Sequence, residues 1–188
     1  MRPKLIDVLE RSPVIAAIKN DEGLLNACES ECRVALMLTG SVVDLPSQVD
    51  RLKDAGKVVI VHADMIAGLS AKEVAVDYLK EIAHADGMIS TKNPLVKYAK
   101  NLGLYAIQRT FAVDSIALST IKKQLKAFEP DAMEILPGII PRVIAEIKQD
   151  TEIPMIAGGL LMDKKDIMEA FKAGADAVST TNEALWNV

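Results

Sequence analysis

Eight short apolar runs recur along this chain of 188 residues, and the stretch after each run carries helix signals. Short apolar runs bounded by turn residues are typical of strands buried on both faces. Their alternation with helices predicts a parallel sheet, because neighbouring parallel strands need a crossover connection. We expect strands at 13–19, 34–40, 58–64, 85–91, 105–111, 132–138, 154–159 and 177–182.

Capping residues mark the boundaries of the intervening helices. Asp114 and Asp163 can each accept a hydrogen bond from a first helical turn, and the SAKE segment at 70–73 fits a capping box. A glycine that follows a helix commonly adopts the left-handed conformation that ends it. We expect this role for Gly56, Gly103 and Gly174.

Eight strands favour a closed (β/α)8 TIM barrel over an open doubly wound sheet. Barrels of this kind typically have about 250 residues, so the connections of this shorter chain must be compact. The final helix can be little more than the turn EALWNV at 183–188. No linker or low-complexity segment interrupts the pattern, and we predict a single α/β domain over residues 1–188.

The composition narrows the class of protein. Half of the residues are hydrophobic and 26% are charged, and no apolar run reaches the roughly 20 residues that span a bilayer. We therefore expect a cytoplasmic protein without membrane contact. The net charge of −4 gives no general attraction for nucleic acid. The two cysteines and two histidines have no recognisable zinc spacing, so no metal site is expected.

The carboxyl ends of the last two strands have the features of an anion site. In (β/α)8 barrels the loops after strands seven and eight commonly hold a phosphate. Gly158 and Gly159 end the seventh strand, where missing side chains would let an anion approach backbone amides. The segment STTN at 179–182, which includes Thr181, lies at the end of the eighth strand, and its Asn182 can cap the final helix. We predict a phosphate site here; the alternative is only a tight turn and a helix cap.

Polar side chains at the other strand ends predict further ligand contacts. Glu134 lies among core residues, where a carboxylate must be paired or used. Lys19 and Lys92 are candidate partners, and the alternative is that each is a solvated charge at the rim. For recognition of a ligand together with Glu134 we expect Lys19 first and Arg109 second. His62 and Asp64 share a strand face and are expected to bind a ligand or each other, with a metal pair as the alternative. The expected ligand-binding residues here are Lys19, His62, Asp64, Lys92, Arg109 and Glu134.

Six segments, taken together and in order, are distinctive and extend over nearly the whole chain. They are VIVHADMIAGL, GMISTK, LYAIQRTF, MEILPGIIP, IPMIAGGL and AVSTTNEALW. The motif IAGG alone is common to many phosphate-binding barrels, whereas the combination and its order are specific. This combination resembles one known family, the glycerol-3-phosphate-responsive antiterminators that control bacterial glycerol-uptake operons.

The resemblance implies a regulator of glycerol metabolism and not an enzyme. Such a TIM-barrel sensor would bind glycerol 3-phosphate as its effector, without a cofactor. It would then act on the leader of an mRNA to prevent transcription termination. The implied partners are glycerol 3-phosphate and leader mRNA, and a homo-oligomer is possible.

The residues themselves give little indication of an RNA surface. No known RNA-binding motif is present, and the few aromatic residues are scattered. The best basic candidate is the helical segment IKKQLK, in which Lys122, Lys123 and Lys126 lie opposite the apolar stripe. The alternative is that these lysines form an ordinary solvated helix face.

The competing hypothesis is a phosphate-binding TIM-barrel enzyme that acts on a glycerol phosphate or a small phosphosugar. Barrels with phosphate sites are mostly enzymes, and the fold alone does not decide between the classes. A Schiff-base enzyme would need a lysine in a dry site, for which Lys19 and Lys92 are the candidates.

Overall fold

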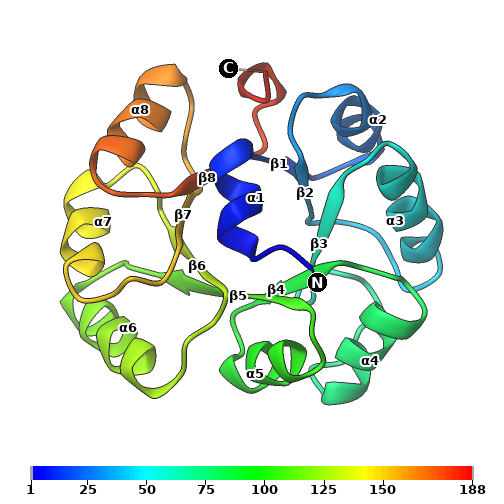
Figure 1. Ribbon diagram of the computed structural model, residues 1–188, viewed down its shortest axis with the longest axis horizontal. Coiled ribbons are helices and arrows are strands. Elements are labelled where there is room, and N and C mark those ends of the chain that lie inside the picture. The colour runs from blue at the N-terminus through cyan, green and yellow to red at the C-terminus, as the bar shows by residue number, and fades with distance from the viewer. Residues whose placement is uncertain (1, 188) are drawn as a thin grey trace.

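Eight parallel strands close into a barrel in chain order, and β8 pairs with β1 (Figure 1). The computed structural model describes residues 2–187, except for the side chain of Lys126. Each predicted strand contains an observed one, which confirms the (β/α)8 TIM barrel. The strands are β1 Val14–Ile18, β2 Val34–Met37, β3 Val58–His62, β4 Gly87–Ser90, β5 Tyr105–Phe111, β6 Ala132–Leu136, β7 Met155–Gly158 and β8 Ala177–Thr180.

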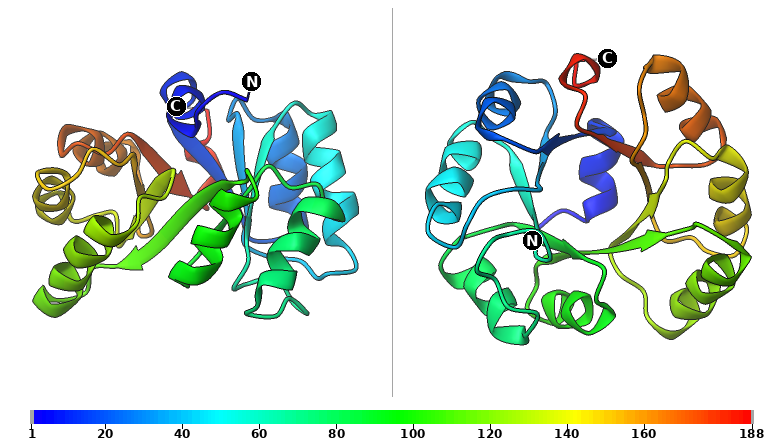
Figure 2. Two further views of the ribbon diagram at one scale, coloured as in Figure 1. Left: turned by 60° about the horizontal axis from the view of Figure 1, so that its bottom comes forward. Right: turned by 180° about the vertical axis from the view of Figure 1, so that it is seen from behind.

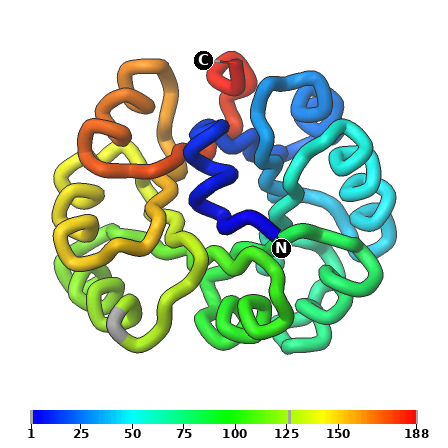
Figure 3. The backbone as a smooth tube through the Cα atoms, in the orientation of Figure 1, coloured from blue at the N-terminus to red at the C-terminus, as the bar shows by residue number. Residues whose placement is uncertain are grey.

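A ring of helices surrounds the barrel, and each of them connects two successive strands (Figures 1 and 3). After β8 the chain makes only one 3₁₀ turn, η1 Glu183–Leu185, so the predicted short final element is confirmed. The connecting helices are α2 Asp21–Glu29, α3 Leu45–Asp54, α4 Glu73–Glu81, α5 Asn93–Asn101, α6 Ser115–Ala127, α7 Pro141–Lys148 and α8 Lys164–Lys172.

An additional helix, α1 Leu5–Arg11, precedes β1 and lies across one end of the barrel (Figure 2). Its Leu5 and Leu9 side chains are buried among the inward-facing strand residues. Tyr105, the first residue of β5, donates a hydrogen bond to the carbonyl of Pro3, so this is the amino end of the strands. Sequence analysis missed the helix because two short turns leave almost no periodicity to detect.

Alternation along the strands divides the apolar core into two layers. Ile15 and Ala17 of β1 face the barrel interior together with α1, whereas Val14 and Ala16 face the surrounding helices. A polar side chain inside the barrel would therefore be costly to bury. The exception is the carboxyl end, where the barrel opens.

Most of the predicted caps are present. The Asp114 carboxylate accepts a hydrogen bond from the Ala117 amide at 2.7 Å, and Asp163 caps α8 in a capping box. The capping box at 70–73 is wrong, because α4 begins only at Glu73 after an uncapped Lys72. The three glycines that were expected to end helices have positive φ, as predicted: Gly56, Gly103 and Gly174.

A lysine–aspartate pair recurs three times at the amino end of the barrel. In each case an aspartate just before an even-numbered strand accepts a hydrogen bond from a backbone amide of the preceding odd-numbered strand. A lysine from the helix before that odd-numbered strand pairs with the same aspartate. The pairs are Lys53–Asp86, Lys100–Asp131 and Lys148–Asp176.

Within residues 2–187, no helix is long and apolar enough to cross a membrane.

Candidate functional site

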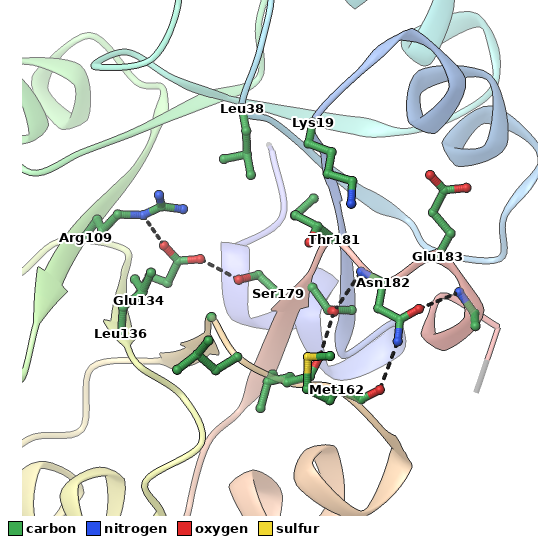
Figure 4. Close-up of a pocket in the computed structure, with 16 residues that line it drawn as sticks. Lys19, Leu38, Arg109, Glu134, Leu136, Met162, Ser179, Thr181, Asn182 and Glu183 are labelled. Carbon is green, nitrogen blue, oxygen red and sulfur yellow. Dashed lines mark hydrogen bonds and ion pairs between the residues drawn. The ribbon is translucent and has the colours of Figure 1, made fainter.

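A pocket of about 630 Å³ opens at the carboxyl end of the barrel (Figure 4). Its walls come from the residues after β1, β7 and β8 and from inward-facing residues of β5 and β6. Six residues of the expected ligand-binding set line it: Lys19, Arg109, Glu134, Gly159, Thr181 and Asn182. The structure thus brings together residues that are 163 positions apart in the sequence.

A buried ion pair forms the floor of the pocket. The Glu134 carboxylate accepts a hydrogen bond from Arg109 Nε at 2.5 Å and a second one from Ser179 Oγ at 2.6 Å. Arg109 and Glu134 are directly opposed in the β5–β6 register, so the sheet itself fixes this pair. Both side chains are buried, and burial of polar groups without hydrogen-bond partners would be costly. Lys19 is not the partner of Glu134, because it is exposed at the rim, as its alternative interpretation predicted.

Gly158 has a different role from the predicted one. It faces the barrel interior, and a Cβ atom there would lie 2.6 Å from Ser179 Oγ and 2.8 Å from Glu134 Oε1. The glycine is therefore required by the buried carboxylate and its hydroxyl partner. It does not line the pocket, so the expected direct contact of Gly158 with an anion is not supported by the geometry.

Gly159 and Leu160 form an unusual backbone segment at the pocket wall. Both residues have left-handed φ values, +79° and +61°, and such a conformation is unfavourable for Leu160. The amides of Gly159, Leu160 and Leu161 donate no hydrogen bond to any group in residues 2–187. Successive unpaired amides at a concave surface are suited to bind an anion.

Asn182 connects the two loops of the predicted phosphate site (Figure 4). Its amide nitrogen donates to the Met162 carbonyl at 2.9 Å, and its side-chain oxygen accepts from the Ala184 amide at 3.2 Å. The predicted cap is confirmed, although η1 is too short to contribute a substantial helix dipole. Because the side chain is fully engaged, Asn182 positions the loops around the pocket. Thr181 lies on the same turn with an exposed hydroxyl.

The charges around the pocket balance. Glu183 lines the pocket and receives a hydrogen bond from the Asn26 amide group, and sequence analysis did not identify it. Lys19 and Arg109 are then matched by Glu134 and Glu183. An anion in this pocket would therefore depend on directed donors such as backbone amides, since the net charge of these four side chains is zero.

Other lining residues also escaped the sequence analysis. Ser179 lies within the STTN segment that we assigned to the phosphate site, yet its bond to Glu134 depends on strands that are 45 positions apart. The apolar part of the wall has no local sequence signal, because these residues look like ordinary core or loop positions. It consists of Leu38, Leu136, Leu160, Leu161 and Met162.

Besides Gly158, three of the expected ligand-binding residues lie apart from the pocket lining: His62, Asp64 and Lys92. Asp64 accepts hydrogen bonds from Ser90 Oγ, from Thr91 N and Oγ1, and from Lys92 Nζ, so it joins the β3–α4 and β4–α5 loops. Burial opposes its ionisation, but these donors outweigh burial and lower its pKa to about 2. Asp64 and Lys92 are therefore structural partners of each other.

His62 faces the barrel interior and is only 2% exposed. Its Nδ1 atom has no hydrogen-bond partner among the described residues. Burial, helped by the positive charge of Arg109, lowers the pKa of His62 to about 4, so the ring is neutral at pH 7. His62 makes no hydrogen bond to Asp64 and does not itself line the pocket, so neither expected contact of its ring is seen.

The expected RNA-binding lysines of α6 differ in their surroundings. Lys122 pairs with Glu146 at 3.2 Å and with Asp150 at 2.9 Å, so α7 neutralises its charge. Lys123 is exposed, and the side chain of Lys126 lies outside the described residues. This helix face presents less free positive charge than the sequence suggested.

Comparison with known proteins supports one family. The family model described as "Glycerol-3-phosphate responsive antiterminator" matches residues 14–186. The uncharacterized protein YgcP of Escherichia coli (strain K12) is 41% identical over 184 residues, which are 98% of this chain and 96% of that protein. Enzymes that are 20% identical or less to this chain have similar structures, and this likeness shows the fold alone.

Two solved structures are similar over almost their whole length. The glycerol uptake operon antiterminator regulatory protein of Listeria monocytogenes str. 4b F2365 is 35% identical with a TM-score of 0.88, over 92% of this chain and 94% of that one. A glycerol uptake operon antiterminator-related protein of Thermotoga maritima MSB8 is 30% identical with a TM-score of 0.82, over 93% and 98% of the two chains. The chain belongs to the family of glycerol-3-phosphate responsive antiterminators.

Proposed function

We propose that the protein binds glycerol 3-phosphate in the pocket at the carboxyl end of the barrel and then acts on a leader mRNA as an antiterminator. The observation that carries the ligand assignment is the row of unpaired amides at Gly159, Leu160 and Leu161, opposite the buried Arg109–Glu134 pair. A leader mRNA as partner implies a cytoplasmic site of action. Family membership supports the effector and the regulatory role.

The two ends of the pocket suit the two ends of the effector. The phosphate would lie against the amides of the β7–α8 loop and near Thr181 and Lys19. The glycerol hydroxyls would face Arg109, whose terminal nitrogens make no hydrogen bond with the described residues. Glu134 already accepts two hydrogen bonds, so its main role would be to orient the Arg109 guanidinium. Its remaining lone pairs could accept a hydrogen bond from a glycerol hydroxyl.

Calorimetric titration tests the ligand. We expect glycerol 3-phosphate to bind, and propyl phosphate, which lacks both hydroxyls, to bind more than tenfold more weakly, a difference of at least about 1.4 kcal/mol. Glycerol and inorganic phosphate serve as controls for the two halves of glycerol 3-phosphate, the glycerol end and the phosphate end. Equal affinities for glycerol 3-phosphate and propyl phosphate would remove Arg109 and Glu134 from hydroxyl recognition.

A matched pair of glycine variants tests the position of the phosphate. Gly159→Val adds a branched side chain beside Leu136 in the pocket, whereas Gly103→Val introduces the same strain at nearly the same φ, +82°, far from the pocket. We expect Gly159→Val to weaken glycerol 3-phosphate binding at least tenfold and Gly103→Val to leave it unchanged. Circular dichroism verifies folding. Unchanged affinity in folded Gly159→Val would place the phosphate elsewhere.

RNA binding is tested by a gel-shift titration with cognate leader RNA, with and without glycerol 3-phosphate. If the ligand strengthens RNA binding, RNA must strengthen ligand binding by the same factor, typically about 5- to 150-fold. Lys123→Gln should weaken RNA binding and reduce its salt dependence, while Lys122→Gln, whose charge is already paired, should have less effect. Equal effects of the two variants would exclude this face of α6.

The competing enzyme hypothesis has less support from the site. A Schiff-base mechanism needs a lysine in a dry environment, but Lys19 and Lys92 are both exposed. Asp64, the candidate metal ligand, is occupied by its four donor groups. Turnover of glycerol 3-phosphate or of a small phosphosugar by the purified protein, without ligand-dependent RNA binding, would establish the enzyme instead.

A further inference from the structure

Apolar side chains are unusually exposed along one side of the pocket mouth. They come from the three consecutive loops that follow β5, β6 and β7. Val113 and Ile116 are 73% and 75% exposed, and Leu160 and Met162 are 64% and 69% exposed. We define the apolar rim as Phe111, Val113, Ile116, Ile139, Ile140, Leu160 and Met162.

Backbone hydrogen bonds hold the three loops side by side. The Ala112 amide donates to the Leu136 carbonyl at 2.8 Å, which joins the first loop to the second. The Gly138 amide donates to the carbonyl of Gly158 at 2.5 Å, which joins the second loop to the third. The rim is therefore one continuous surface on a tethered backbone, and it includes a shallow hollow of about 330 Å³ beside Val113 and Ile116.

The area of the rim is that of an interface. Its seven residues expose on the order of 700 Å², which exceeds the largest apolar patch of a typical monomer, about 300–600 Å², and approaches the 800 Å² or so that each partner contributes to a standard interface. All seven side chains are more than a third exposed, so packing in the barrel core does not account for their exposed parts. A partner that covers them is the physical reason for their presence.

We propose that the apolar rim is the surface through which two copies of this chain associate. An apolar surface can pack against the same surface of a second copy, as a two-fold symmetric contact requires. The flanking charges are of both signs, Asp114, Arg142 and Asp163, so they select neither an acidic nor a basic partner. RNA is a poor occupant, because its phosphates would lose water without gaining cations, and Phe111 alone offers little base stacking.

The rim and the pocket share residues. Leu160 and Met162 belong to both, and Leu160 follows Gly159 in the strained segment with unpaired amides. An anion bound to those amides would therefore hold the strained segment at Leu160 in one conformation. Because this segment is part of the rim, ligand binding would strengthen the association of the two copies. This last step rests on the proposed function, whereas the dimer itself does not.

Sedimentation equilibrium on the full chain, from about 1 to 100 μM, measures the association. Ile116→Glu places a charge on the rim at the second residue of α6, where an acidic side chain favours the helix. Val74→Glu is the matched control, at the second residue of α4, 63% exposed and outside the rim. We expect the parent to dimerise, Ile116→Glu to raise the dimer dissociation constant at least tenfold, and Val74→Glu to change it less than twofold.

Three results would overturn the proposal. They are a parent that remains monomeric with and without glycerol 3-phosphate, a dimer that Ile116→Glu leaves intact, and a monomeric parent whose leader-RNA affinity falls in Ile116→Glu. Runs without ligand test the dimer alone, so failure of glycerol 3-phosphate to bind would count against the proposed function and leave the dimer measurement valid. Inorganic phosphate and glycerol 3-phosphate arms then test the ligand effect: a dimer that neither anion strengthens would refute the coupling.

Discussion

At the scale of single residues, Gly158 illustrates how a buried carboxylate constrains its neighbours. The side chains of Glu134 and Ser179 occupy the volume into which a Cβ atom of residue 158 would project. The glycine is therefore explained by packing against a polar pair, which no local pattern reveals. Its neighbour Gly159 is explained differently, by a left-handed backbone beside the pocket.

We predict that Gly158→Ala destabilises the protein by about 2–4 kcal/mol, because overpacking and disruption of a buried hydrogen-bonded pair both contribute. The double variant Gly158→Ala, Ser179→Ala should recover part of this loss, since it removes the oxygen that lies 2.6 Å from the new methyl group. Urea unfolding of the four members of the cycle measures the coupling. Additive effects in the double variant would contradict this explanation.

His62 predicts a pH dependence of stability. Its pKa is about 4 in the folded protein, and a histidine in the unfolded chain titrates near 6.5, so the unfolded state binds the proton first as pH falls. The stability from neutral His62 is fully present above pH 6.5 and is lost between pH 6.5 and pH 4, up to about 3 kcal/mol. In His62→Gln the slope over this interval should flatten, as measured by urea unfolding at several pH values. An unchanged slope would assign the effect to other groups.

At the scale of secondary-structure elements, the recurring lysine–aspartate pairs connect α3, α5 and α7 each to the two strands that follow it. Asp176 accepts hydrogen bonds from Lys148 Nζ and from the Met155 amide, both at 2.7 Å. One carboxylate thus fixes α7, β7 and the start of β8 relative to one another. This arrangement orients the loop between β7 and α8 that forms the pocket wall.

Asp176→Ala should therefore cost about 2–3 kcal/mol, because it removes two charge-assisted hydrogen bonds and leaves the Met155 amide without its acceptor. The control is Glu169→Gln, which breaks the exposed Lys172–Glu169 pair on α8 and should cost less than about 0.5 kcal/mol. Thermal and urea unfolding give both values. Similar costs for the two variants would mean that the Asp176 pair is only a surface ion pair.

At the scale of the whole molecule, α1 makes the barrel a closed unit. It covers the amino end of the interior, while the functional pocket opens at the opposite, carboxyl end. The barrel can therefore hold polar groups at one end only, because the other end is sealed with apolar side chains. The apolar seal and the candidate pocket therefore lie at opposite ends of the barrel axis.

We expect α1 to unfold together with the barrel. Leu9 is fully buried, and Leu9→Ala should lower the free energy of unfolding by about 2–5 kcal/mol while leaving a single transition. Ile6→Ala, on the half-buried side of the same helix, should cost less. Denaturant unfolding followed by circular dichroism and by tryptophan fluorescence tests this. Separate transitions, or no loss of stability in Leu9→Ala, would mean that α1 is an independent appendage.

The sequence by itself determined the eight strands, most helix caps and two of the loops that line the pocket, because strand periodicity, capping and strand-end glycines are local signals. Only the tertiary structure decided that Arg109 pairs with Glu134, that Ser179 completes the pair, and that Lys19 stays at the rim. The register between β5 and β6 and the closure of β8 on β1 set these contacts. These contacts join residues that are far apart in the chain, so local sequence patterns cannot predict them.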